Sequence, residues 1–260
     1  MKKYIGRYMY LSLMFAALLL SLLIYNSKDI MAAYEEGDVS NGGTITGTVK
    51  IAGDVPETKM ITVDKDQKAC GHDPKPSEAL LVSSDKNVRN AVVSITNISK
   101  GKKYEKPAEN PSIDQKGCVF IPHVVIIPPG STVDLLNGDD VMHNLHSWSI
   151  KNTSFNEGVA GGGELPKTFE YPETVKMTCD VHKWMNAWII VQDNPYYAVT
   201  DANGRFQIGD VPPGTYTVQV WQESLGKAKQ EVTVSAGGEA KADFELKKKK
   251  KRKRRRKKKD

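Results

Sequence analysis

Residues 175–191 read Val-Lys-Met-Thr-Cys-Asp-Val-His-Lys-Trp-Met-Asn-Ala-Trp-Ile-Ile-Val, and they bring a thiol, an imidazole and a thioether together within a few positions. The three side chains belong to Cys179, His182 and Met185. Crowded into one turn, they are expected to surround a single point. This short stretch organises the interpretation of the rest of the chain.

A fourth donor lies upstream, at His143, where a polar loop gives way to the alternating stretch 145–150. A soft thiolate and two imidazoles suit both Cu(I) and Cu(II), and a weak axial thioether holds the geometry. We therefore predict one mononuclear copper, with Cys179, His143 and His182 in the plane and Met185 axial. Zinc fits less well, because Met is a poor zinc ligand.

The ordered motifs around these donors resemble the cupredoxins of the plastocyanin and amicyanin type. The resemblance covers residues 117–192 and implies a Greek-key β-sandwich with a type 1 copper. The motifs that carry it are Phe120-Ile121-Pro122, Pro129-Gly130-Ser131-Thr132-Val133, Asn137-Gly138-Asp139-Asp140, His143-Asn144, Val175-Lys176-Met177-Thr178-Cys179, His182, Met185 and Ala187-Trp188-Ile189-Ile190-Val191.

The resemblance also implies roles for residues beside the ligands. Asn144 is expected to tie the ligand loop near the sulfur of Cys179 without touching the metal. The imidazole of His182 is expected near the surface, where electrons would pass through its exposed edge. Trp184 would then belong to the docking patch. In the alternative, Trp184 is buried against a second β module.

Two further cysteines, Cys70 and Cys118, remain once Cys179 is assigned to the metal. In an exported protein, two spare cysteines most simply form a disulfide. The alternative is a second metal site in which Cys118 and His123 join His72 or His146. The spacing does not demand such a site, so the disulfide is the favoured prediction.

The N-terminus predicts export. Lys2, Lys3 and Arg7 precede an uncharged, mostly apolar run at 8–25, and small residues follow at 31–33. This pattern is typical of a secretory signal covering residues 1–33. The run is also about long enough to remain as a slightly short membrane span. Either outcome puts the copper domain outside the cytoplasm, in the periplasm or the extracellular space.

Apolar and polar residues alternate along much of the remaining chain, as at 44–51, 90–95, 124–127 and 215–221. Alternation with a period of two is typical of β-strands, and no long apolar pattern of helical period interrupts it. We predict an all-β fold. Residues 101–116, rich in Lys, Pro, Glu and Asn, are expected to form a linker.

The C-terminal part, residues 193–246, resembles the carboxypeptidase regulatory-like, transthyretin-like (prealbumin-like) β-sandwich. Asn203-Gly204 and Pro212-Pro213-Gly214 predict turns, the first of them in a hairpin. Residues 34–100 contain strands that resemble the start of such a sandwich. The copper module is therefore either inserted between two halves of one sandwich or placed in tandem with it.

Charge is distributed very unevenly. The formal net charge is +6, yet thirteen Lys and Arg stand in the tail 247–260, so the body of the chain is acidic. Such a tail is expected to be disordered and attracted to anionic surfaces, including an anionic membrane. The alternative is a solvated tail without a specific role. Nucleic acid is an unsuitable partner, because the export signal conflicts with it.

These features favour an electron carrier, not an enzyme, that exchanges single electrons with redox protein partners. One alternative is a copper storage or delivery protein. Another is an electron-relay subunit of a copper-containing redox enzyme. Catalytic copper in such enzymes commonly uses His-x-His pairs, and this chain has five His and no such pair. His143 and His146 do not substitute, because strand residues three apart face opposite sides.

Overall fold

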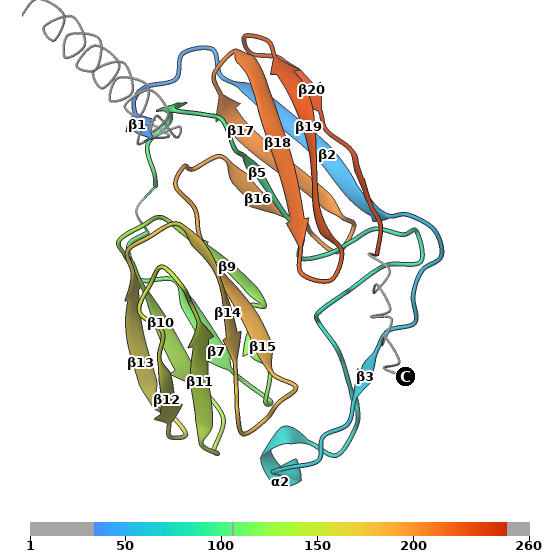
Figure 1. Ribbon diagram of the computed structural model, residues 1–260, viewed down its shortest axis with the longest axis vertical. Coiled ribbons are helices and arrows are strands. Elements are labelled where there is room, and N and C mark those ends of the chain that lie inside the picture. Colours follow the sequence, from blue (N-terminus) through green and yellow to red (C-terminus); the bar gives the residue numbers. More distant parts are fainter. Residues whose placement is uncertain (1–33, 106, 249–260) are drawn as a thin grey trace, which may run out of the picture. The chain divides into compact units, whose positions relative to one another are not determined.

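The computed structural model describes residues 34–105 and 107–248 (Figure 1). Within these ranges the regular secondary structure is β-strand apart from one short helix, α2 (Gln67–Cys70), so the predicted all-β fold is confirmed. The same ranges contain no helix long and apolar enough to cross a membrane. The predicted signal at 1–33 and the tail from 249 onward lie outside the described residues.

One β-sandwich, which we call the ligand sandwich, holds the predicted copper ligands. Its two sheets follow the orders β13-β10-β7-β8 and β12-β11-β14-β15-β9. The strands are β7 (Ser112–Gln115), β8 (Phe120–Ile121), β9 (Val124–Ile127), β10 (Ser131–Asn137), β11 (His143–Trp148), β12 (Asn156–Val159), β13 (Glu164–Phe169), β14 (Glu173–Thr178) and β15 (Asn186–Val191). Alternate side chains from both sheets fill its core, as expected for facing sheets.

The predicted linker at 101–116 is wrong over its last residues. Ser112–Gln115 form β7, which runs parallel to β10 with Ile113 opposite Leu135. The side chain of Ile113 is buried in the core of the ligand sandwich. The sequence did not predict this strand, because its single apolar residue is surrounded by Pro, Ser, Asp and Lys and shows no alternation of apolar and polar residues.

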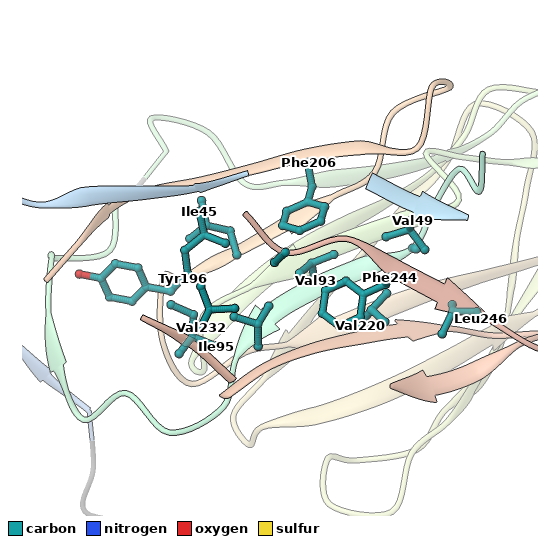
Figure 2. Packing of buried hydrophobic residues seen from close by; sticks show 14 of the residues in the cluster. Ile45, Val49, Val93, Ile95, Tyr196, Phe206, Val220, Val232, Phe244 and Leu246 are labelled. Carbon is teal, nitrogen blue, oxygen red and sulfur yellow. The ribbon is translucent and has the colours of Figure 1, made fainter. Parts of the chain in front are cut away.

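A second sandwich, the flanking sandwich, combines strands from both ends of the described chain. Its sheets follow the orders β16-β5-β18-β19 and β17-β2-β20, and β21 also pairs with β2. The strands are β2 (Gly43–Ile51), β5 (Val92–Ile95), β16 (Tyr197–Val199), β17 (Arg205–Val211), β18 (Gly214–Gln222), β19 (Gly226–Val234), β20 (Glu239–Lys241) and β21 (Phe244–Leu246). Figure 2 shows the core that these strands share, with Ile45 and Phe206 among its members. In sequence, the ligand sandwich falls between β5 and β16.

The turn at Asn203-Gly204 connects strands of different sheets, so the hairpin predicted there is wrong. β16 pairs with β5, whereas β17 pairs with β2. Gly204 has a φ of +67°, and a Cβ at this position would approach the carbonyl oxygen of Val49 to 2.6 Å. Glycine is required for both reasons, and the turn carries the chain from one sheet to the other.

Between β2 and β5 the chain makes an excursion, residues 55–78, which we call the strap. A short ladder of β3 (Met60–Ile61) and β4 (Lys75–Pro76) forms its base, and α2 forms its tip (Figure 1). Val63 and Cys70 of the strap are buried in the core of the ligand sandwich. The strap therefore leaves the flanking sandwich after β2, packs its tip on the ligand sandwich and returns to the flanking sandwich at β5. A final small pair, β1 (Glu35–Glu36) and β6 (Lys100–Gly101), is parallel.

Candidate metal centre

The predicted ligand loop is the turn of the hairpin formed by β14 and β15. Thr178 and Asn186 are the last paired residues, so the loop begins at Cys179 and ends at Met185. The backbone N–H of Met185 donates to the carbonyl of His182 at 2.9 Å. Paired strands on both sides and this internal hydrogen bond hold the three side chains of the loop in one place.

His143 reaches the same place from β11. This strand is antiparallel to β14, with His146 opposite Thr178, so its first residue lies beside the ligand loop. His143 is fully buried, whereas His146 is partly exposed and contacts Asp180 at 3.1 Å. The two imidazoles therefore occupy opposite faces of β11, as expected for residues three apart.

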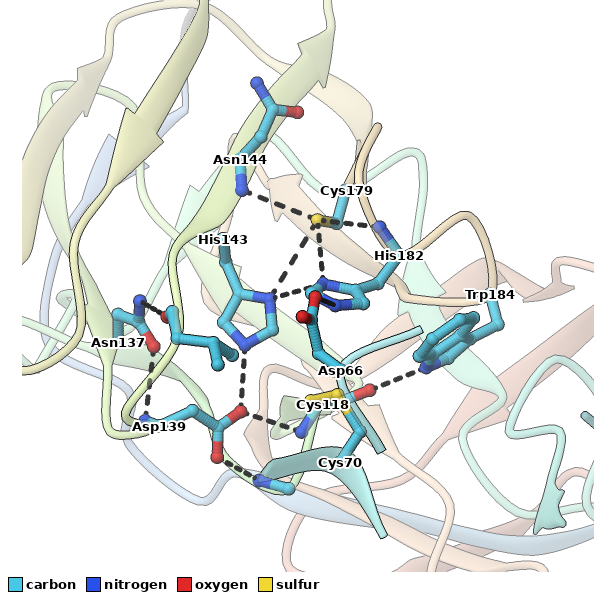
Figure 3. Close-up of a disulfide and its surroundings, with 12 residues drawn as sticks. Asp66, Cys70, Cys118, Asn137, Asp139, His143, Asn144, Cys179, His182 and Trp184 are labelled. Atoms are coloured by element: carbon cyan, nitrogen blue, oxygen red, sulfur yellow. Dashed lines mark hydrogen bonds and ion pairs between the residues drawn. A yellow bond between two sulfur atoms is a disulfide. The ribbon is translucent and has the colours of Figure 1, made fainter. Parts of the chain in front are cut away.

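Three donor atoms converge in the buried interior (Figure 3). Nδ1 of His143 lies 2.9 Å from Nδ1 of His182, and Sγ of Cys179 lies 4.0 Å and 3.8 Å from these two nitrogens. The point in their plane that is equidistant from all three atoms lies about 2.1 Å from each, within the ~2.0–2.3 Å range of metal bonds to imidazole and thiolate. The triangle has the size that a transition-metal ion requires.

Each imidazole is oriented by a carboxylate on its far nitrogen. Nε2 of His143 lies 2.9 Å from Oδ2 of Asp139, and Nε2 of His182 lies 2.8 Å from Oδ2 of Asp66. An ionised carboxylate only accepts hydrogen bonds, so each Nε2 carries the proton and each Nδ1 presents a free electron pair. Carboxylate–histidine pairs of this kind fix the tautomer of metal ligands and raise their basicity.

Burial lowers the pKa of His143 below its ordinary value, and the neighbouring imidazole of His182 acts in the same direction, although Asp139 opposes them. The neutral form of His143 is thereby favoured, and that is the form that binds metals. The neutral imidazole of His143 then faces Nδ1 of His182 and the sulfur of Cys179. A cation is the natural partner for such a set.

Asn144 ties the ligand loop to β11. Its backbone N–H donates to Sγ of Cys179 at 3.4 Å, and its side-chain oxygen accepts the backbone N–H of Asp180 at 2.9 Å. The backbone N–H of His182 also donates to the same sulfur at 3.4 Å. Two backbone N–H groups therefore point at the sulfur of Cys179.

Met185 is buried at the end of the ligand loop, in the same core cluster as Cys179. Its backbone carbonyl accepts the N–H of Cys179 at 3.4 Å, which closes the loop on itself. Its role as the axial ligand stays a prediction.

The two remaining cysteines, Cys70 and Cys118, form a disulfide, and Cys179 is the free cysteine. The alternative second metal site around Cys118 is thereby excluded. His123, which that alternative required, is instead paired with Glu223 of the flanking sandwich. The disulfide joins the tip of the strap to the ligand sandwich.

The structure contradicts the exposed edge predicted for His182. This residue is fully buried: Asp66 lies over its outer nitrogen, Nε2, and the sulfurs of the Cys70–Cys118 disulfide lie within 4.8 Å of a ring nitrogen. Trp184 is half-buried, and its indole N–H donates to the carbonyl of Cys118 at 2.9 Å (Figure 3). The exposed edge that the docking prediction assigned to His182 is therefore wrong, whereas the docking role of Trp184 stays a prediction. Trp184 packs beside the disulfide and not against the flanking sandwich.

Sequence reasoning assigned no role to Asp66 or Asp139, although both contact metal-site imidazoles. Asp139 stands four residues before His143, within a motif that the resemblance included, and its side chain also accepts the backbone N–H of Cys118 at 2.8 Å. Asp66 is 116 positions from His182, and only its place four residues before Cys70 connects it with the site.

Comparison with models of known protein families finds a match to the C-terminal part of the chain. The carboxypeptidase regulatory-like domain family matches residues 185–247. The matched range begins at the end of the ligand loop and includes β15, so its first residues belong to the ligand sandwich in the structure. No curated protein matches the chain.

Several solved structures are similar to about a third of the chain. A purple cupredoxin from Nitrosopumilus maritimus is 24% identical, over 32% of this chain and 100% of that one, with a TM-score of 0.29. Amicyanin from Paracoccus versutus is 22% identical, over 34% and 86%, with a TM-score of 0.29. A copper-containing nitrite reductase from Thermus scotoductus SA-01 is 24% identical, over 35% and 24%, with a TM-score of 0.31. The chain spans about a quarter of that enzyme. Residues 185–247 thus match the model of the carboxypeptidase regulatory-like domain family, within an all-β chain of two sandwiches.

Proposed function

We propose that this protein binds one type 1 copper and carries single electrons between redox partners. The observation that supports the proposal is the buried triangle formed by Sγ of Cys179 and the Nδ1 atoms of His143 and His182. Thiolate and imidazole together suit copper, and the buried thioether of Met185 completes the donor set.

The residues around the triangle supply what one-electron transfer needs. The hairpin of β14 and β15, together with Asn144, holds the donors so that little rearrangement accompanies a change of charge. Burial keeps water from the donors. Bound copper would alternate between Cu(I) and Cu(II) and so take up and release one electron.

The test is copper loading of the purified protein, followed by visible and EPR spectroscopy. The wild type should bind one Cu(II) with an intense thiolate-to-copper absorption, and Cys179→Ser should abolish that absorption. His143→Ala should also abolish it, whereas the matched variant His146→Ala, on the opposite face of β11, should retain it. An intact spectrum in Cys179→Ser would show that the assignment is wrong.

Copper storage or delivery is a second candidate, favoured by one observation. The outer edge of His182 is covered by Asp66, and a closed site retains metal better than it exchanges electrons. Fast electron self-exchange in the copper-loaded protein would support the carrier. Slow self-exchange with ordinary copper affinity would support storage.

We further propose that the protein acts without catalysing a reaction of its own. Among the described residues, His146 contacts Asp180 and His123 contacts Glu223, so neither is assembled with other donors into a second copper site. Export to the periplasm or the extracellular space is part of the same proposal. It is supported by the N-terminal pattern and by the disulfide of Cys70 and Cys118, since disulfides persist in oxidising compartments.

A further inference from the structure

The strap places a carboxylate over a metal-site imidazole from a distant part of the chain. Asp66 stands directly before α2, with a backbone φ of 46° and ψ of 38°, in the left-handed region. That conformation is uncommon for residues other than glycine, although Asp and Asn adopt it more readily than most. In it, Oδ2 of Asp66 lies 2.8 Å from Nε2 of His182. This contact closes the outward edge of the imidazole.

A single disulfide connects the strap with both carboxylates of the site. Cys70, at the end of α2, is bonded to Cys118, and the backbone N–H of Cys118 donates to Oδ2 of Asp139 at 2.8 Å. Asp139 in turn holds His143. The sulfurs of the disulfide also lie within 4.8 Å of a ring nitrogen of His182. The position of the strap is thereby coupled to the orientation of both imidazoles.

Apart from this disulfide, little apolar surface holds the strap on the ligand sandwich. Val63 and Cys70 are the strap residues buried in that core. A pocket of about 410 Å³ lies beside the tip, lined by Asp66, Lys68, Ala69, Asp140 and Val141. Segments with few buried apolar contacts open locally at a low free-energy cost. The strap therefore has the attachments expected of a cover rather than of a core element.

We propose that Asp66 is a positioning residue of the metal centre and that the strap is a cover over the edge of His182, pinned by the Cys70–Cys118 disulfide. With the strap in place, a protein partner cannot contact that edge, and the negative charge on Asp66 favours the more oxidised metal. With the strap released, the edge of His182 is free. This inference rests on the proposed function only for its effect on electron exchange, since the cover itself is a property of the protein without metal.

The cover is tested first on metal-free protein at pH 7, by reaction with diethyl pyrocarbonate and peptide mapping of each histidine. Exposed His72 serves as the fast internal reference. Asp66→Gly removes the side chain and is compatible with the left-handed backbone. We expect the modification rate of His182, relative to His72, to rise about tenfold or more, the change produced by ~1.4 kcal/mol of lost protection. The double variant Cys70→Ser/Cys118→Ser should show the same increase.

Two conservative variants separate shape from charge. Asp66→Asn retains an acceptor for the N–H of His182, so it should keep His182 protected in the metal-free protein. Once copper is bound, the same variant should have a raised reduction potential, because the negative charge that favours Cu(II) is gone. Asp64→Asn, a matched change at an exposed position of the strap, should alter neither quantity.

The outcomes distinguish this inference from the proposed function. If His182 reacts as slowly in Asp66→Gly and in the folded double serine variant as in the wild type, the proposal that the strap covers His182 is wrong. An unchanged potential in Asp66→Asn would overturn the positioning role. If the wild type showed no thiolate-to-copper absorption, the proposed function would fail, while the protection of His182 would still be measured in the metal-free protein.

Discussion

The indole rings of Trp188 and Trp221 meet edge to face, with their centroids 5.0 Å apart and their planes at 74°. Trp188 lies on β15, shortly after the ligand loop, and Trp221 lies on β18 of the flanking sandwich. Beside them, the buried His123 is paired with Glu223, which also accepts from the side chain of Asn186 at 3.3 Å. The two sandwiches thus share a mixed aromatic and polar contact close to the metal centre.

Removing the charge of Glu223 should weaken that contact. Glu223→Gln replaces the nearer carboxylate of the buried His123 with a neutral amide and leaves Glu78, 3.8 Å from Nδ1, as its other carboxylate contact. We expect the free energy of unfolding to fall by about 1–3 kcal/mol. Urea unfolding followed by tryptophan fluorescence measures the change. Glu231→Gln, at an exposed position of β19, should leave stability unchanged. Equal stability of Glu223→Gln and the wild type would contradict an energetic role for the pair.

Met185 is expected to set the reduction potential without being required for copper binding. Met185→Gln should retain copper and lower the potential, because a thioether favours the reduced state more than an amide oxygen does. Protein-film voltammetry gives the potential directly. Met142→Gln changes an exposed methionine next to His143 and is the matched control. A potential that does not fall in Met185→Gln would count against axial ligation.

Asn144 is expected to act through the ligand loop. Asn144→Ala removes the acceptor for the backbone N–H of Asp180, and we expect copper affinity to fall by about 10-fold to 100-fold. The loss should appear as faster copper release to a chelator, together with a shifted potential. Asn203→Ala, in an exposed turn of the flanking sandwich, should release copper at the wild-type rate. An unchanged release rate and potential in Asn144→Ala would contradict the prediction.

The lowered pKa of Glu173 leads us to expect that the folded protein loses stability in acid. Burial opposes its ionisation, yet hydrogen bonds from Ser149 and from the backbone and side chain of Asn152 lower its pKa from 4.5 to about 2. Because the folded-state pKa is depressed, this contribution is fully present above pH ~4.5 and is lost as pH falls toward 2.

The contribution of Glu173 is measured by urea unfolding of wild type and Glu173→Gln between pH 2 and pH 7. The variant should be less stable than the wild type at pH 7 by about 1–2 kcal/mol, and the difference should shrink as the pH falls below ~4.5. The matched change Glu170→Gln should give no difference at any pH. A Glu173→Gln difference that is constant across the range would contradict the assigned role.

The basic tail at 247–260 is proposed to attach the protein to anionic membranes. Each Lys or Arg contributes on the order of 1 kcal/mol at an anionic bilayer surface, and salt weakens the attraction. The copper-loaded protein should sediment with phosphatidylserine vesicles at low salt and be released at high salt. Truncation after Leu246 should remove this binding and leave the copper spectrum intact. If the truncated and full-length proteins bind the vesicles equally, the tail does not attach the protein to membranes.

The sequence by itself determined the features that depend on neighbours along the chain. Alternation of apolar and polar residues predicted strands such as β2 and β18, because the two-residue period of a strand can be read from consecutive residues. The spacing of Cys179, His182 and Met185 placed three donors in one turn, and the structure shows that turn as the hairpin between β14 and β15. The strand β7 escaped detection because its alternation rests on a single apolar residue.

Only the tertiary structure decided how the metal site is closed. Asp66 and His182 are 116 positions apart, and they meet because the strap leaves one sandwich and is bonded through Cys70 to the other. No local pattern records such a meeting, since a carboxylate on an exposed turn looks the same in sequence whether it faces water or an imidazole. Donor identity is therefore a property of the sequence here, whereas the burial of His182 follows from long-range packing.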